Sequence, residues 1–177
     1  MTVEEIRQQA LELAEKEFKK FEPVALYNTK KVLEAFKECQ LSDYHFNGTS
    51  GYGYNDAGRE KLDEVFAHVF KGERAIVRPH FVSGTHALAT TLQAILGNGS
   101  KGKEFVYAVG QPYDTMQSVI GASRHVPGSL TEQGFIYKEV PLVNNTYDLE
   151  GIRQAITKDT RVVVIQRSRG YSTREPL

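Results

Sequence analysis

The residues best suited to chemistry lie where predicted strands end and helices begin. In the first such place, Ser83-Gly84-Thr85 runs straight into a predicted helix. N–H groups at a helix start lack intrahelical partners and carry a partial positive charge, so they bind phosphate without a basic side chain. Gly84 lets the backbone approach closely, and the hydroxyls of Ser83 and Thr85 add donors. A simple helix cap, with Ser83 as capping residue and Gly84 in the turn, fits the same residues.

A second strand end carries an aromatic residue. The segment 110–115 reads Gly-Gln-Pro-Tyr-Asp-Thr, with Tyr113 at the start of a short predicted helix. If this strand neighbours the first, the Tyr113 ring would stack on a flat heteroaromatic ligand whose phosphate lies at Gly84. Such a pair of sites describes a pyridoxal phosphate pocket better than a nucleotide pocket. An ordinary aromatic residue at a helix start is the alternative.

The third strand end, 166–174, is rich in arginine and contains Arg167, Arg169 and Arg174. A guanidinium pairs bidentately with a carboxylate, so this loop is a candidate for binding a substrate carboxylate; a solvated basic loop is the alternative. The five histidines include no pair at helical metal spacing, and we expect no metal site.

The elements that position these segments alternate in type. A mainly parallel α/β sheet follows from strands alternating with helices, and ligands bind such sheets where strand carboxyl ends meet helix starts. Strands are predicted over 75–78, 104–109, 135–141 and 161–166, and helices over 85–96, 113–120 and 149–156, the last capped by Asp148. The aliphatic run 162–165 indicates a strand covered on both faces.

The N-terminal part is helical. Apolar spacing predicts one helix from about Ile6 to Phe21, ended by Pro23, and a second over 26–39. These helices form a predicted arm, residues 1–45, that either packs on its own core or reaches a second subunit. The main domain is predicted over 46–177, opening with a glycine-rich stretch at 47–56 and a helix with apolar residues at 62, 65, 66, 69 and 70.

Composition narrows the class of protein. Lys+Arg and Asp+Glu are both 22 in 177 residues, so nothing electrostatic favours nucleic acid or an anionic membrane as a partner. The single cysteine, Cys39, excludes an intrachain disulfide. The acidic N-terminus lacks the plan of a secretory signal, and we expect a cytoplasmic protein.

Three motifs together carry a family resemblance. Segments 51–59, 83–88 and 110–115 resemble, in order, the methionine gamma-lyase-like family labelled aluminium resistance proteins. That family is similar to the Cys/Met-metabolism branch of pyridoxal-phosphate enzymes with the aspartate-aminotransferase fold (fold type I). The resemblance covers nearly the whole chain and implies a partial fold type I large domain preceded by two helices.

The resemblance also implies roles for single residues. Ser83, Gly84 and Thr85 would bind the cofactor phosphate, and Tyr113 would stack on the pyridine ring. Tyr54 would reach the phosphate from a neighbouring subunit, which implies a homodimer or homotetramer. The wider group has an arginine two places after that tyrosine, where Asp56 stands here, and Arg59 is the candidate substitute. Arg167 and Ser168 fall on the substrate side.

The implied activity is that of a pyridoxal-phosphate-dependent carbon–sulfur lyase of the methionine gamma-lyase or cystathionine lyase type, acting on a sulfur amino acid. Members of the family next supply an aspartate for the pyridine nitrogen and the Schiff-base lysine. We therefore expect this chain to be an inactive N-terminal fragment. A complete, non-catalytic α/β binding module is the main alternative. A nucleotide-binding domain is disfavoured by the missing glycine fingerprints.

Overall fold

The computed structural model describes residues 1–52, 54, 56–97, 102–168, 173, 175 and 177. The chain divides into two compact units, Met1–His80 and Phe81–Leu177, and each is described by itself. The predicted arm, residues 1–45, lies within the first unit, and its boundary stays a prediction.

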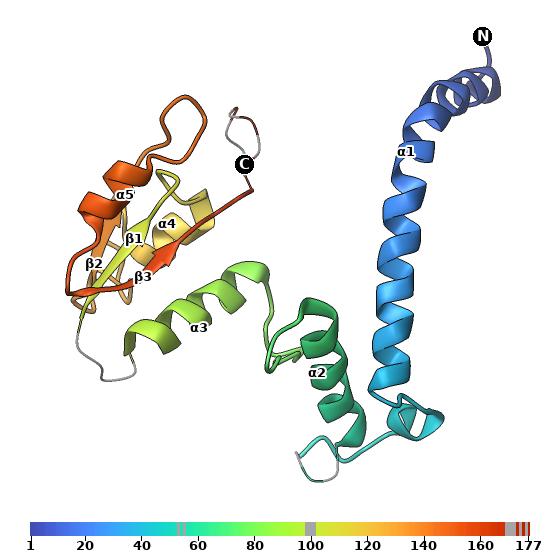
Figure 1. Cartoon of the computed structure of the whole chain (residues 1–177), viewed down its shortest axis with the longest axis horizontal. Coiled ribbons are helices and arrows are strands. Elements are labelled where there is room, and N and C mark those ends of the chain that lie inside the picture. The colour runs from blue at the N-terminus through green and yellow to red at the C-terminus, as the bar shows by residue number, and fades with distance from the viewer. Residues whose placement is uncertain (53, 55, 98–101, 169–172, 174, 176) are drawn as a thin grey trace. The chain divides into compact units, whose positions relative to one another are not determined.

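The second unit is built on three parallel strands, β1 (Glu104–Tyr107), β2 (Ile136–Glu139) and β3 (Thr160–Val164), in the order β2-β1-β3 (Figure 1). This arrangement confirms the predicted α/β fold with a parallel sheet. The run 162–165 suggested that β3 would be covered on both faces, but β3 is half-buried along its length. The central and best buried strand is β1, in which Phe105 and Val106 are fully buried.

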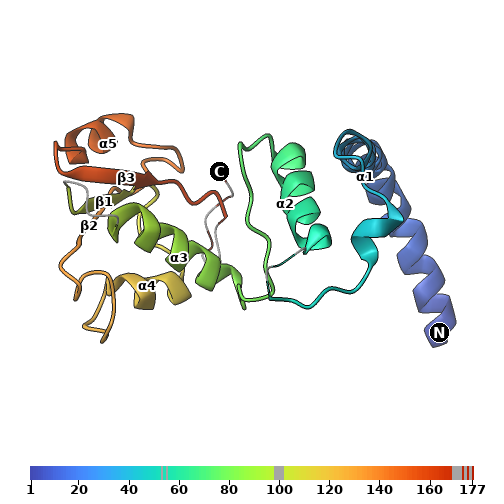
Figure 2. The same cartoon turned by 90° about the horizontal axis from the view of Figure 1, so that it is seen from below.

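Three helices cover this sheet. Helices α3 (Gly84–Gly97) and α4 (Asp114–Ile120) lie on one face, and α5 (Leu149–Ala155) lies on the other (Figure 2). The carboxylate of Asp148 accepts a hydrogen bond from the N–H of Gly151 at 2.9 Å, which confirms the predicted cap of α5. The core on the α3–α4 face consists of Leu92, Leu96, Phe105, Tyr107, Met116, Ile120 and Leu130.

The first unit contains α1 (Val3–Glu38), a 3₁₀ turn η1 (Asp43–Phe46) and α2 (Ala57–Phe70). The prediction of two N-terminal helices separated at Pro23 was wrong, since α1 continues through Pro23. Proline removes one hydrogen bond, to the residue four places earlier, and a helix accommodates its ring by bending. Figure 1 shows α1 bent in its N-terminal half. The good helix formers on both sides, and a capping box between Thr2 and Glu5, favour one continuous helix.

Residues 75–78 were predicted to form a strand, and this was also wrong. The segment has no strand partner among the described residues and is instead fixed to α2. The carboxylate of Asp63 accepts the N–H of Val77 at 2.7 Å and two guanidinium N–H groups of Arg78 at 2.6 and 2.8 Å. A strand needs a neighbour to satisfy its backbone, and here a side chain takes part of that role.

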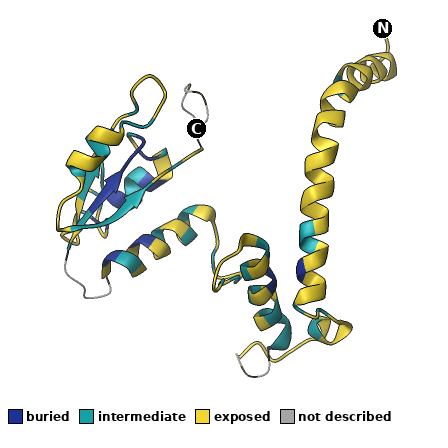
Figure 3. Cartoon of the chain, in the orientation of Figure 1, coloured by how far each residue is buried: buried dark blue, intermediate teal, exposed yellow. Residues whose placement is uncertain are grey.

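Much of the apolar surface of α1 is exposed (Figure 3). Leu13 is 79% exposed and Phe21 64%, while Ala35 is the buried residue of the helix. In α2, of the apolar residues predicted at 62, 65, 66, 69 and 70, Val65 is buried, whereas Phe70 is 72% exposed. Within the described part of the chain, no helix is both long and apolar enough to cross a membrane.

Candidate functional site

The start of α3 has a side-chain cap, and two of its backbone N–H groups remain unpaired with any residue that the structure describes. The hydroxyl of Ser83 accepts the N–H of His86 at 3.1 Å, so Ser83 acts as the helix cap. The N–H groups of Gly84 and Thr85 have no hydrogen-bond partner among the described residues. A Cβ placed on Gly84 would meet nothing within 4 Å. Capping by Ser83 therefore leaves two backbone donors without an intramolecular partner in the described part of the chain, at a turn with room beside Gly84.

His86 shapes this turn, a role that sequence reasoning missed. Its ring nitrogen Nδ1 accepts the N–H of Val82 at 3.4 Å, and its ring lies 5.8 Å from that of Phe81. The side chain thus folds back over the residues that precede the helix. The spacing of four residues between Val82 and His86 is the feature of the sequence that could have predicted this hydrogen bond.

Tyr113 occupies the N-cap position of α4 and is half-buried. Its backbone N–H donates to the side-chain oxygen of Gln166 at 3.3 Å, which connects the start of α4 to the end of β3. The Gln117 amide donates to the carbonyl of Pro112 at 2.9 Å and holds the same turn from within the helix. The Tyr113 backbone is therefore fixed from two sides.

The two helix starts lie next to each other. The hydroxyls of Thr85 in α3 and Thr115 in α4 are 2.8 Å apart and form a hydrogen bond. The pocket predicted from the sequence requires this adjacency between the Gly84 turn and the Tyr113 turn. It arises from packing of α3 against α4, and not from a first strand at 75–78.

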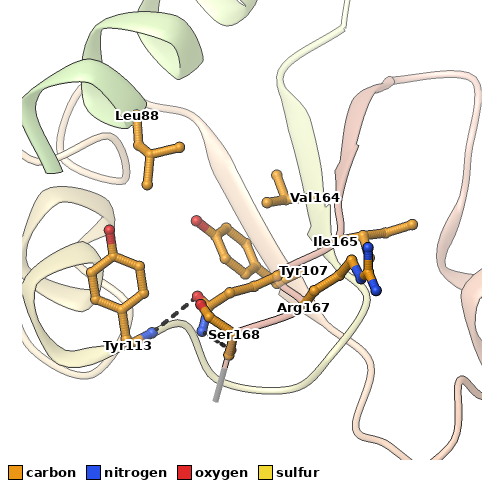
Figure 4. Close-up of a pocket in the computed structure, with 8 residues that line it drawn as sticks. Leu88, Tyr107, Tyr113, Val164, Ile165, Arg167 and Ser168 are labelled. Carbon is orange, nitrogen blue, oxygen red and sulfur yellow. Dashed lines mark hydrogen bonds between the residues drawn. The ribbon is translucent and has the colours of Figure 1, made fainter. Parts of the chain in front are cut away.

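A pocket of about 630 Å³ opens beside Tyr113 at the carboxyl end of the sheet (Figure 4). Parallel sheets bind ligands at this end. The register pairs Tyr107 with Val164, so both reach the pocket from adjacent strands. The pocket brings together the predicted site residues Tyr113, Arg167 and Ser168. Its lining is Leu88, Tyr107, Tyr113, Val164, Ile165, Gln166, Arg167 and Ser168.

The predicted substrate-side loop after β3, residues 166–168, lines the same pocket. The side-chain amide of Gln166 donates to the carbonyl of Ser168 at 3.0 Å. The guanidinium of Arg167 points away from Tyr113 (Figure 4), and its Nε donates to the carbonyl of Leu177 at 3.3 Å. Arg169 and Arg174 lie outside the described residues. Gln166 links the Tyr113 turn to this loop. Its position two residues after β3, at the carboxyl end of the sheet, was the signal in the sequence that could have found it.

Tyr54 belongs to the first unit, where its side chain is 79% exposed. It lines a hollow of about 420 Å³ together with Tyr44, Ala57, Gly58 and the loop 47–50. Arg59, the candidate substitute for the phosphate-binding arginine, forms an ion pair with the buried Asp56 at 3.3 Å.

Among the described residues, no cluster of three or more His, Cys, Asp or Glu side chains is arranged to bind a metal ion. The fold and the pocket define a parallel α/β domain with a ligand-binding end built from an open helix start, an aromatic ring and a polar loop. The family model described as methionine gamma-lyase matches residues 3–177. The chain belongs to the methionine gamma-lyase family.

Known proteins support this assignment. The Bacillus subtilis protein YnbB is 37% identical over 158 residues, which are 88% of this chain and 37% of YnbB. A Listeria innocua structure, named as a candidate cystathionine beta-lyase involved in aluminum resistance, matches with a TM-score of 0.86 at 40% identity, covering 99% of this chain and 43% of that one. A Clostridium novyi structure, named as a carbon-sulfur lyase involved in aluminum resistance, matches with a TM-score of 0.82 at 41% identity, covering 96% and 40%. The chain thus spans about two fifths of the length of these relatives.

Proposed function

We propose that this chain forms the cofactor-binding part of a pyridoxal-phosphate-dependent carbon–sulfur lyase that acts on a sulfur-containing amino acid. Membership of the methionine gamma-lyase family supports this class of reaction. The names of the Listeria innocua and Clostridium novyi structures point to the same chemistry. The observation that carries the proposal is the Thr85–Thr115 hydrogen bond, because it joins the open helix start to the Tyr113 pocket.

The residues present fit the cofactor at both of its ends. A phosphate needs several donors and room to approach, and the Gly84 turn offers two N–H groups that are unpaired among the described residues, and open space beside the Gly84 Cα. The flat ring needs an aromatic surface and apolar walls, which Tyr113, Leu88 and Val164 offer in the adjacent pocket. When bound, the cofactor supplies the electron sink that stabilises negative charge at the α-carbon of the substrate.

We propose that residues at the rim of the pocket bind the substrate carboxylate, and that a second subunit contributes a contact to the cofactor phosphate. Arg167 and Ser168 line the pocket, and in this proposal they bind the substrate carboxylate after the Arg167 guanidinium leaves the carbonyl of Leu177. The exposed Tyr54 contributes to the phosphate site of a neighbouring subunit. The active protein is accordingly at least a homodimer.

The Schiff-base lysine is proposed to lie in the part of the relatives that this chain does not span. We expect the 177-residue chain to bind pyridoxal phosphate non-covalently, and at least about 10-fold more tightly than pyridoxal, because only the former engages the Gly84 turn. Equilibrium dialysis measures both affinities. Equal affinities would refute the phosphate site. A stoichiometric lysine-bound cofactor, detected by its visible absorption and by mass after borohydride reduction, would refute the placement of the lysine.

A non-catalytic interaction module is the second candidate function. The exposed apolar residues of α1, such as Leu13 and Phe21, favour it, since solvated apolar stripes often mark contact surfaces. The same dialysis separates the two candidates. A chain that binds neither pyridoxal phosphate nor pyridoxal, yet unfolds cooperatively, fits the interaction module and contradicts the lyase proposal.

A further inference from the structure

Tyr107 is a buried residue whose hydroxyl has no hydrogen-bond partner among the described residues. The residue is 2% exposed, and among the described residues its hydroxyl makes no hydrogen bond. The neighbouring phenol of Tyr137, in contrast, donates to the carboxylate of Glu139 at 2.5 Å. The ring of Tyr107 is packed in the core, but its hydroxyl oxygen is not fully buried, so it is accessible from the pocket and a ligand there can pair with it.

The Tyr107 side chain lines the pocket that Tyr113 borders. In Figure 4 its hydroxyl points toward the side of the pocket formed by Leu88 and Tyr113. The ring itself is fixed in the core, with its centroid 6.4 Å from that of Phe105 and 5.9 Å from that of Tyr137. Packing of the ring therefore holds the hydroxyl in one direction, toward the space a ligand would fill.

The chemical state of this phenol is well defined. Burial, with the nearby Tyr113 as a smaller cause, raises the pKa of Tyr107 to about 12. The phenol is thus protonated at neutral pH and available as a hydrogen-bond donor. The neighbouring walls, Leu88, Val164 and Ile165, are apolar. A hydrogen bond to a ligand in this setting would be shielded from competing water.

We infer that Tyr107 contacts the bound ligand and that its hydroxyl donates to an acceptor atom on the edge of a flat ring held against Tyr113. Tyr107 then selects among ring-shaped ligands, favouring those with an acceptor on the edge that faces β1. The identity of the ring as pyridoxal phosphate rests on the proposed function. The donor role rests on the pocket, the packing of the Tyr107 ring and the unpaired hydroxyl.

The test compares Tyr107→Phe with the matched control Tyr137→Phe in the 177-residue chain. Each removes one phenolic oxygen from the same aromatic cluster, but Tyr137 does not line the pocket. We expect Tyr107→Phe to weaken pyridoxal phosphate binding by about 2- to 10-fold, the range of one neutral hydrogen bond, and Tyr137→Phe to leave it unchanged. The melting temperature of Tyr107→Phe should not fall, since no intramolecular hydrogen bond is lost.

A second pair of probes separates this inference from the proposed function. Pyridine N-oxide and toluene are flat rings of similar size, with and without an acceptor oxygen, and ligand-observed NMR measures their binding. The wild-type chain should favour pyridine N-oxide over toluene, and Tyr107→Phe should reduce that preference by about 2- to 10-fold. If pyridoxal phosphate does not bind but this Tyr107-dependent preference is found, the proposed function fails and the inference stands. Unchanged binding of pyridoxal phosphate in Tyr107→Phe, or no such preference, would overturn the inference.

Discussion

Breaking the Thr85–Thr115 hydrogen bond should weaken cofactor binding even though Thr115 is not expected to touch the ligand. The 2.8 Å contact joins residues 30 positions apart and connects the first turns of α3 and α4. A neutral hydrogen bond contributes about 0.5–1.5 kcal/mol, and since both partners are exposed we expect a value near the lower end for stability. Its loss also frees the Gly84 turn to move relative to Tyr113. We expect Thr115→Val to raise the dissociation constant for pyridoxal phosphate about 3- to 10-fold.

A double-mutant cycle tests this reasoning. Thr85→Val removes both the pair and a possible phosphate donor, whereas Thr115→Val removes the pair alone. The double variant should therefore bind about as weakly as Thr85→Val, with a coupling energy of about 0.7–1.4 kcal/mol in dialysis, the equivalent of the 3- to 10-fold loss in Thr115→Val, and about 0.5 kcal/mol in urea denaturation. Thr91→Val is the matched control, because that hydroxyl donates at 2.8 Å to the carbonyl of Ala87 in its own helix. Additive losses at positions 85 and 115, or an equal loss in Thr91→Val, would refute a positioning role for the pair.

Two further predictions concern the free energy of unfolding measured with urea. Gly58→Ala should lower the free energy of unfolding by about 1–3 kcal/mol, because a Cβ there would collide with the backbone carbonyl of His45. Gly84→Ala should change the free energy of unfolding by less than about 0.5 kcal/mol, because a Cβ at Gly84 meets open space. Similar values for the two variants would contradict these packing assignments. The hydrogen bonds from Arg78 lower the pKa of Asp63 in the folded state below its ordinary value of 3.8. The Asp63 carboxylate therefore stabilises the fold fully at pH values above 3.8. This stabilisation is lost as the pH falls through the lowered pKa of the folded state. Asp63→Asn should thus be less stable than wild type at pH 7, and a difference undiminished at pH 2 would count against the ion pair.

Local sequence patterns were sufficient for most elements of the second unit. Helix α3 and the cap of α5 at Asp148 follow from apolar spacing and from a side chain that bonds its own backbone. The parallel sheet follows from the alternation of strands and helices. These features depend on residues within a few positions of each other, which is why the chain order alone predicts them.

Two other predictions from the sequence were wrong, the first because local effects compete and the second because the segment contacts a residue distant in the chain. Pro23 predicts a helix end because a proline removes one hydrogen bond, yet the helix formers around it outweigh that loss and α1 continues. The segment 75–78 has the composition of a strand, but strand formation needs a partner, and Asp63 binds it instead.

The candidate site also combines features that residue types predict with features that depend on tertiary packing. The residue types at Gly84, Tyr113 and Arg167 were enough to suggest a phosphate turn, a ring surface and a substrate loop. Only the tertiary structure brought Thr85 next to Thr115, tied Tyr113 to Gln166, and turned the hydroxyl of Tyr107 toward the pocket. A helix start exposes its N–H groups wherever it occurs, so local sequence is enough to find it. The packing of α3 and α4 on one face of the sheet decides which helix starts share a pocket, and that packing is set by side chains far apart in the chain.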